Sequence, residues 1–308
     1  SYIPTSGSTV TRAAETLTVP AANMPWPTPV VIGSELVTNG TFDTDTSGWS
    51  TSSADLSAVS GELQISNQSS SPVSAYQSIS LTIGKVYAVE VTSRLGGGGG
   101  SVARASFFGN IFAAANSETP VTETIYIVAS SSLATLSLFS YGTSSTEAYF
   151  DNVSVKEINP LSVSIQMDGR MTFADDDSNA LNPYFFNWEE NSSNRLNSFN
   201  RTNGTYRGAV QFQQRINNVN TSVGEGTGSA GSYTEGVNVP FNIASRHGST
   251  FINGAIDGTS LTANTTPTAL PDLSTTDLNL ASDFMGTIGK FRVWSNDLTD
   301  TGIEEAST

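Results

Sequence analysis

The sequence predicts an all-β protein built from two β-sandwich (jelly-roll) domains, one of them inserted into the other. Short apolar runs recur along the chain and are separated by clusters of Gly, Asn, Ser or Asp. Many of these runs alternate apolar and polar residues, which is typical of a sheet with one buried face. Charged residues make up only 13% of the chain, and the Gly, Asn and Ser that replace them supply the backbone angles of tight turns.

Several of the predicted strands show this alternation. It is strict in Ser162–Gln166, where Val163 and Ile165 are the apolar residues, and partial in Phe150–Val155, where Phe150, Val153 and Val155 are apolar. The only stretch that favours a helix is the tail, Asp300–Ser307. The runs that we predict as strands are Glu62–Ser66, Val86–Thr92, Thr122–Val128, Ala134–Phe139, Ala148–Val155, Ser162–Gln166, Ala209–Arg215 and Gly289–Trp294.

Proline residues indicate two domain junctions. Pro25–Pro29 contains three prolines, which lack backbone donors and therefore leave a sheet rather than continue it. Asn159-Pro160 closes the next block. We therefore predict one domain at residues 31–158 and a second, discontinuous domain at 1–30 plus 159–308. The five glycines Gly96–Gly100 are predicted to form a hairpin tip within the first domain.

Composition excludes several kinds of partner. The formal net charge of −15 repels nucleic acid and anionic membranes, so we expect neither nucleic-acid binding nor membrane insertion. The longest apolar runs are too short to span a bilayer. The chain has no cysteine, which excludes disulfides and thiolate metal sites. Because the chain opens on Ser1 rather than Met, we expect a fragment or a processed product.

Two motifs bracket the predicted inner domain. Asn39–Asp43, followed by Gly48-Trp49, resembles the opening of bacterial carbohydrate-binding modules with a galactose-binding-like jelly roll. Tyr149–Val155 resembles the last strand of the same modules. The resemblance implies a jelly roll that binds sugar, either in loops at one end or on a sheet face.

A sugar ring has an apolar face, which stacks on an exposed aromatic ring, and a rim of hydroxyls, which suits polar side chains and backbone groups. We expect Trp49, Tyr76, Phe108 and Tyr141 to be the carbohydrate-binding residues. Tyr141 follows a strand in the polar segment Ser140–Thr143 and is the best candidate for exposure. For Trp49 the alternative is that of a core anchor, because jelly rolls need large residues between their sheets.

The same resemblance implies a structural calcium site between the first strand and the last. Ca²⁺ takes six to eight oxygen ligands, and the candidates are Glu35, Asn39, Asp43 and Asp151. The alternative is that these Asp and Asn residues serve only in turns.

The predicted outer domain resembles laminin-G and concanavalin-A-like sandwiches. The resemblance is carried by Phe241–Gly258, which we interpret as two strands with a hairpin at Asn253-Gly254, and by Gly286–Asp300 as the closing strand and helix cap. The opening Ser1–Glu15 resembles a segment of phage tail-fibre and gene-transfer-agent proteins. We interpret Asp175–Asp177 as a solvated turn, with a calcium site as the alternative.

We do not expect an enzyme. The single histidine, His247, is not accompanied by a Gly-x-Ser-x-Gly motif that would place a nucleophile beside it. Glu189 and Glu190 are adjacent, so on a strand they point to opposite faces and do not form the carboxylate pair of a glycosidase.

The sequence thus predicts a non-catalytic protein of the virion surface, a tail fibre or head spike, that is extracellular when it acts and binds host cell-surface polysaccharide. Its expected partners are this glycan, other virion proteins and further copies of itself, with a trimer as the expected state. Two alternatives remain: a structural assembly module that binds no sugar, and the accessory region of a secreted polysaccharide-processing protein.

Overall fold

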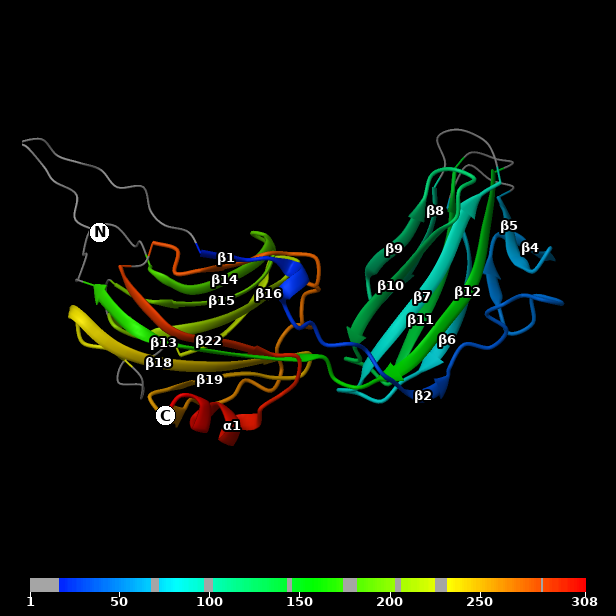
Figure 1. The fold of residues 1–308 in the computed structure, drawn as a ribbon. Helices are drawn as coiled ribbons and strands as arrows, with labels where there is room; N and C mark the ends of the chain where they lie inside the picture. Colours follow the sequence, from blue (N-terminus) through cyan, green and yellow to red (C-terminus); the bar gives the residue numbers. More distant parts are fainter. Residues whose placement is uncertain are drawn as a thin grey trace, which may run out of the picture. The chain divides into compact units, whose positions relative to one another are not determined.

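The computed structural model describes residues 17–67, 72–96, 102–142, 146–173, 182–202, 206–224, 232–283 and 285–308 (Figure 1). Nearly all regular structure in these ranges is antiparallel β, which confirms the predicted fold class. The helical elements described are the 3₁₀ turn η1 (Ala21–Asn23) and the helix α1 (Thr299–Ala306), close to the predicted helical tail. No helix within the described ranges is long and apolar enough to cross a membrane.

The chain folds into two compact units. The continuous unit is Pro29–Pro160, and the discontinuous unit combines the chain up to Thr28 with Leu161–Thr308. The predicted limits of the inner domain, 31 and 158, differ from these limits by two residues at each end. The resemblance of the discontinuous unit to laminin-G sandwiches stays a prediction.

The continuous unit contains two sheets, which we call B and C. In sheet B the strands β10, β7, β12, β5 and β4 are neighbours in that order, and β2 also pairs with β12. The order in sheet C is β3-β6-β11-β8-β9. The strands of sheet B are β2 (Val31–Glu35), β4 (Ala54–Val59), β5 (Glu62–Asn67), β7 (Val86–Leu95), β10 (Val121–Val128) and β12 (Thr146–Ile158), and those of sheet C are β3 (Ser50–Ser52), β6 (Val73–Ser80), β8 (Val102–Phe107), β9 (Asn110–Ala115) and β11 (Leu133–Tyr141).

Apolar residues at every second position fill the core of this unit. In β5, Leu63 and Ile65 are fully buried, while the residues between them are partly exposed. Phe107 from sheet C and Phe150 from sheet B belong to the same core cluster. Burying one such side chain contributes roughly 1.5–3 kcal/mol, so the alternation read from the sequence determines which face of each strand turns inward.

The two ends of the continuous unit lie side by side. β2 pairs with the last part of β12. Just before β2, the backbone N–H of Val30 donates to Asn159 Oδ1 at 2.6 Å, and the N–H of Asn159 donates to the carbonyl of Val30 at 2.9 Å. The chain therefore enters and leaves this unit at one point.

The discontinuous unit also contains two sheets, A and D. Sheet A has the order β1-β21-β14-β15-β16-β17, and sheet D has the order β20-β19-β18-β13-β22. The strands of sheet A are β1 (Leu17–Val19), β14 (Tyr184–Asn191), β15 (Asn194–Asn200), β16 (Val210–Ile216), β17 (Val219–Val223) and β21 (Leu278–Leu280), and those of sheet D are β13 (Ser162–Phe173), β18 (Gly236–Gly248), β19 (Ile252–Ile256), β20 (Thr259–Ser260) and β22 (Gly286–Trp294).

A bulge in β14 turns two consecutive aromatic residues toward sheet D. The register of β14 against β15 shifts between Tyr184 and Phe186. As a result Phe185 packs on Phe241 with ring centroids 4.9 Å apart, and Phe186 packs edge-on against His247 at 6.2 Å. In the run Tyr184–Trp188, Phe185, Phe186 and Trp188 are therefore core residues.

Helix α1 covers the other face of sheet D. Its Ile303 is fully buried against Ala244 and Ala255. Arg246 of β18 forms ion pairs with Asp297 at 2.9 Å and with Asp300 at 2.7 Å. This pairing holds the start of the helix to the sheet.

The predicted hairpin at Asn253-Gly254 is wrong. Both residues lie inside β19, where Gly254 leaves room for the ring of Phe212: a Cβ there would come within 2.1 Å of it. The turn falls instead at Asp257-Gly258, where φ is +47° and +79°. An Asp-Gly pair with both φ positive is a favoured two-residue hairpin turn.

Three segments that the sequence analysis singled out lie outside the described residues. They are Ser1–Glu15, Asp175–Asp177 and most of the glycine run, residues 97–100.

The single histidine is enclosed in the core of the discontinuous unit. His247 is fully buried, with Ser245 Oγ 3.2 Å from its Nε2. Burial lowers its pKa from 6.5 to about 3, because the charged imidazolium is poorly solvated there.

His247 is therefore expected to make the stability of this unit depend on pH. Below about pH 6.5 the unfolded chain binds a proton that the folded unit excludes, so the free energy of unfolding falls as pH falls, by up to about 1.4 kcal/mol per pH unit. Urea unfolding between pH 6.5 and 5, where most carboxylates stay ionised, measures this slope. His247→Phe removes it, and the same slope in that variant would contradict the assignment.

Candidate functional site

The outward face of sheet C carries a group of aromatic residues. In β11, Leu136 and Leu138 are fully buried, so Ser137, Phe139 and Tyr141 point away from the core. Tyr76 of β6 is paired with Ser137 and therefore lies on the same face. Arg104 of β8 is paired with Phe139. We call Tyr76, Phe139, Tyr141 and Arg104 the aromatic face.

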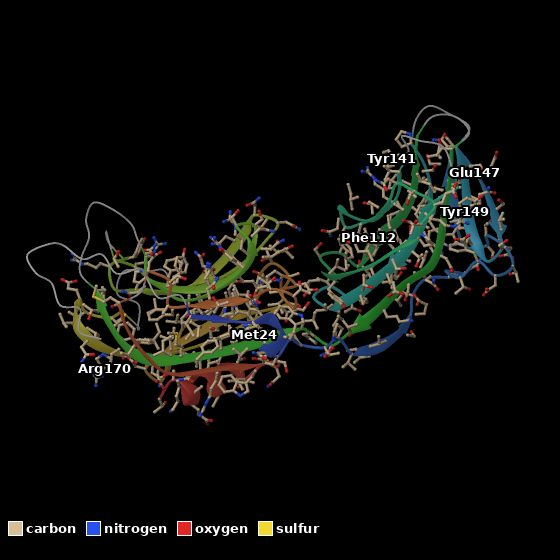
Figure 2. All side chains as sticks on the ribbon, turned by 45° about the horizontal axis from the view of Figure 1, so that its top comes forward. Met24, Phe112, Tyr141, Glu147, Tyr149 and Arg170 are labelled. Atoms are coloured by element: carbon tan, nitrogen blue, oxygen red, sulfur yellow. The ribbon has the colours of Figure 1, made fainter. Side chains whose placement is uncertain are left out.

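Contacts between its members order this face. The rings of Phe139 and Tyr141 have centroids 5.5 Å apart. The guanidinium of Arg104 lies 3.9 Å from the centroid of Tyr141 and also donates a hydrogen bond to its hydroxyl. A cation over an aromatic ring is attracted by the ring quadrupole. Tyr141 is thereby held in place at the end of its strand (Figure 2).

Hydroxyl groups continue the face across the sheet. Ser50, Tyr76, Ser137, Ser106 and Ile111 form one row over five strands, because each is the direct partner of the next. Serine hydroxyls both donate and accept hydrogen bonds. A half-exposed ring beside such groups suits a ligand with one apolar face and a rim of hydroxyls, which describes a pyranose.

The structure brings together two of the four predicted sugar-binding residues. Tyr76 and Tyr141 lie on the aromatic face, both half-buried. Trp49 is only 9% exposed and packs on Phe42 with centroids 5.5 Å apart. Its Nε1 donates to the carbonyl of Asn39 at 3.1 Å. Trp49 is therefore a core residue and offers no ring face to a sugar.

Phe108 lies apart from the aromatic face. It occupies the turn between β8 and β9 at φ +50° and packs edge-on against the buried Phe107 at 5.1 Å. It is partly buried against the core, so it serves to close this hairpin.

Phe139 and Arg104 were missed by the sequence analysis. The signal for Phe139 was present, because it follows Ser137 by two residues and precedes Tyr141 by two, in phase with the outward side of β11. Arg104 has no comparable signal, since its place beside Tyr141 depends on the pairing of β8 with β11.

The outward face of sheet B is also polar, but its groups satisfy one another. Arg94 lies 4.0 Å from the centroid of Tyr149 and donates to Glu62. The Tyr149 hydroxyl donates to Glu147 at 2.8 Å and accepts from Gln64 at 2.8 Å. This network is complete within the unit, so it favours a structural role.

The carboxylate of the predicted calcium ligand Glu35 accepts hydrogen bonds from within its own unit. Its Oε1 accepts backbone N–H groups of Leu36, Val37 and Val155 at 2.8–3.0 Å, and its Oε2 accepts the hydroxyl of Ser154 at 2.7 Å. Burial alone would raise its pKa, but these hydrogen bonds and the charge of Lys156 outweigh burial and lower it. Glu35 thus ties β2 to β12, and its role as a calcium ligand stays a prediction.

The other three predicted calcium ligands are Asn39, Asp43 and Asp151. Asn39 donates through Nδ2 to Asp45 and to the carbonyl of Ser47. The pKa of Asp151 is raised, first by burial and then by the charges of Glu62 and Asp43. In the part of the chain that the structure describes, no three His, Cys, Asp or Glu residues are placed to hold a metal ion together.

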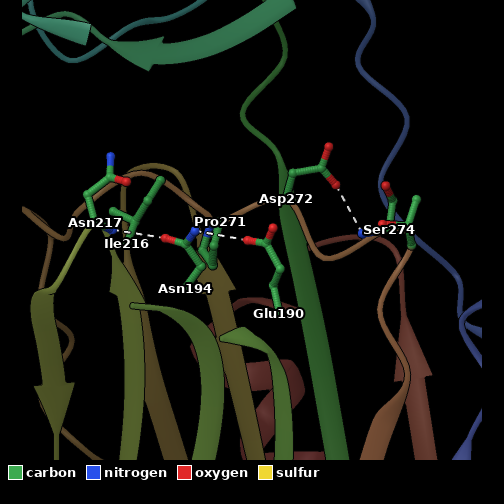
Figure 3. A pocket seen from close by; sticks show the side chains of 8 residues that line it. Glu190, Asn194, Ile216, Asn217, Pro271, Asp272 and Ser274 are labelled. Carbon is green, nitrogen blue, oxygen red and sulfur yellow. Dashed lines mark hydrogen bonds between the residues drawn. The ribbon is translucent and has the colours of Figure 1, made fainter. Parts of the chain in front are cut away.

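A pocket of about 340 Å³ opens in the discontinuous unit (Figure 3). Its polar groups are paired internally: Asn194 donates to Glu190 at 2.9 Å and accepts from the N–H of Asn217 at 2.9 Å, and Asp272 accepts from the N–H of Ser274 at 3.0 Å. These hydrogen bonds fix the positions of Asn194, Glu190 and Asp272 in the pocket wall. It is lined by Glu190, Asn194, Ile216, Asn217, Pro271, Asp272, Ser274 and Thr275.

The residues considered for catalysis do not form a reactive group. His247 has no access to solvent. Glu189 faces Arg195 across 4.0 Å, and Glu190 accepts from Asn194 at the pocket. The expectation of a non-catalytic protein stays a prediction.

Comparison with known proteins gives likenesses in structure but none in sequence. No protein family and no curated protein matches the chain. Among solved structures, a CBM4 structure has 19% identity and a TM-score of 0.32, with 39% of this chain and 98% of that chain covered. The CBM40 of the Ruminococcus gnavus IT-sialidase, bound to α2,6-sialyllactose, has 12% identity and a TM-score of 0.36, with 48% and 84% covered.

A structure of botulinum neurotoxin type C has 13% identity and a TM-score of 0.35, with 47% of this chain and 35% of that chain covered. This chain thus spans about a third of the neurotoxin chain it resembles. All three TM-scores lie below 0.5.

Glu35→Gln is expected to destabilise the continuous unit by about 1–2 kcal/mol, because the charge-assisted hydrogen bonds to Glu35 weaken and Ser154 loses its acceptor. Since the pKa of Glu35 is lowered, its contribution is present above the normal Glu pKa and is lost as pH falls through the lowered value. Urea unfolding at pH 7 measures the change. The exposed Glu118→Gln is the matched control, and an equal effect there would contradict this role.

Proposed function

We propose that this protein is a non-catalytic glycan-binding protein and that the aromatic face of sheet C is its sugar-binding surface. The observation that carries this proposal is the presence of Tyr76, Phe139 and Tyr141 on one outward sheet face, together with Arg104. Aromatic residues in a soluble domain normally turn inward. Their presence on the outward side, in phase on neighbouring strands, calls for a ligand.

The chemistry of the face matches a sugar. Stacking of a ring face on Tyr76 or Phe139 removes apolar surface from water. Arg104 and the serines of β8 and β11 supply donors and acceptors for hydroxyls at the rim. Such a shallow site binds one sugar chain weakly, and several copies in one assembly raise the affinity through effective concentration. A homo-oligomer, with a trimer as the first expectation, is part of the proposal.

We place the protein on the surface of a virion, where it binds a host cell-surface polysaccharide outside the cell and contacts other virion proteins. The support is the resemblance of Ser1–Glu15 to phage tail-fibre and gene-transfer-agent proteins. The absence of cysteine agrees with assembly in a reducing cytoplasm.

Calcium remains part of the proposal, as a structural ion between the first strand and the last, with Glu35, Asn39, Asp43 and Asp151 as its expected ligands. The support is the resemblance of Asn39–Asp43 and Tyr149–Val155 to bacterial carbohydrate-binding modules, together with the oxygen ligands that these four side chains offer.

Tyr76→Ala and Phe139→Ala are each expected to weaken glycan binding at least about tenfold, or ~1.4 kcal/mol, because each removes a stacking surface. A glycan array identifies the ligand of the native protein, and titration with that glycan measures the loss. The array is run with Ca²⁺ and with EDTA.

Tyr206 is an exposed tyrosine of the discontinuous unit. Tyr206→Ala is therefore the matched control and should bind the glycan normally. Unchanged binding by both aromatic variants would exclude this face. If EDTA neither weakens binding nor lowers the melting temperature, the calcium proposal fails. If a folded native sample binds no glycan, the protein is better explained as an assembly module.

The virion placement predicts that the protein co-purifies with particles. Particles banded in a density gradient should contain the chain by mass spectrometry, and an antibody against it should label them in electron micrographs. Recovery only in the particle-free fraction would exclude the virion placement without affecting the sugar-binding proposal.

A further inference from the structure

The outward face of sheet A holds a row of amide side chains. Phe185, Phe186 and Phe212 contact sheet D, so they mark the inner side of sheet A. The residues on the opposite side follow from the strand register. Asn279, Asn187, Asn197, Gln213 and Ser222 form one row over five strands, each the direct partner of the next, and Thr18 of β1 extends it.

This row is not satisfied from within the unit. Asn197 is completely buried, yet neither its Oδ1 nor its Nδ2 has a hydrogen-bond partner, and the Oδ1 of Asn187 also lacks one. A buried polar group without a partner is costly. Asn197 lies between the half-buried Asn187 and Gln213, so a polar ligand that separates these two side chains would reach it.

Two arginines lie directly beside this row. Arg195 of β15 and Arg215 of β16 are direct cross-strand partners, an arrangement that is destabilising for like charges. A carboxylate oxygen of Glu189 lies 4.0 Å from the guanidinium of Arg195. Arg215 donates a hydrogen bond to the neutral side chain of Asn218 at 3.2 Å. The Nε of each arginine is buried without a partner. In a chain with a net charge of −15, a cationic pair with so little neutralisation favours an anion.

An aromatic pair closes the other side of the row. Tyr184 and Phe199 are cross-strand partners, with ring centroids 5.4 Å apart. Phe199 follows Asn197 by two residues, so both rings lie on the outward side of sheet A. Tyr184 is half-buried and offers the more accessible ring.

We propose that this face of sheet A is a second glycan-binding site, and that its ligand is an acidic polysaccharide. Arg195 and Arg215 bind a carboxylate of the chain, since guanidinium groups pair with carboxylates in bidentate geometry. The amides of Asn187, Asn197 and Gln213 contact hydroxyls, and Tyr184 stacks on a sugar ring. The site lies in the other unit from the aromatic face and does not depend on it.

The test is affinity electrophoresis of the full chain through gels that contain polygalacturonate, hyaluronan or polysialic acid. We expect at least one of these polymers to retard the native protein and its carboxyl-reduced form to retard it much less. Arg195→Gln/Arg215→Gln should weaken the binding at least tenfold. Asn197→Ala should weaken it less, by a few fold.

Matched variants separate this site from general charge effects. Arg170→Gln/Arg292→Gln removes the same charge from sheet D and should bind like the native protein. Arg195→Lys/Arg215→Lys keeps the charge and should bind with intermediate affinity. Circular dichroism and melting temperature establish that each variant is folded.

Three results would overturn the proposal: no retardation of the native protein by any of the three polymers, undiminished binding by folded Arg195→Gln/Arg215→Gln, or equal retardation by duplex DNA. Tyr76→Ala/Phe139→Ala should retain the acidic-polymer binding. Loss of acidic-polymer binding in Tyr76→Ala/Phe139→Ala would instead assign this binding to sheet C. The two proposed sites can therefore be disproved independently.

Discussion

The two-residue period of the β-strand is the constraint on which the rest of this structure depends. Once the apolar residues of a strand turn inward, every second residue must turn outward, whatever its chemistry. Leu136 and Leu138 fix β11 in this way, and Phe139 and Tyr141 are consequently presented to solvent. In sheet A the same rule places Asn187 and Asn197 opposite the aromatic core.

Much of the fold could be predicted because this two-residue period is visible in short stretches of consecutive residues. Ser162–Gln166 and Phe150–Val155 were assigned from alternation alone and lie within β13 and β12. The hairpin at Asn253-Gly254 failed because a glycine has two uses, a positive φ in a turn or space for a neighbour. Gly254 provides space for Phe212, and that need is visible only when sheet A is packed on sheet D.

The candidate sites were harder to predict because they depend on pairing between distant strands. Tyr76 and Tyr141 could be proposed singly, but their common face requires the register of β6 and β11. Trp49 and Glu35 were plausible ligand residues by type, yet each already has partners in the fold. Arg195 and Arg215 show the same limit most clearly, because nothing in the sequence between them indicates that they stand side by side.

The pairing of Val30 with Asn159 has a consequence for protein engineering. Because the chain enters and leaves the continuous unit at one hydrogen-bonded point, this unit is an insertion whose two ends already meet. A simple turn, or another domain with adjacent ends, would fit the same junction with little rearrangement. Replacement of the unit at this point would leave the strand pairing of the discontinuous unit intact.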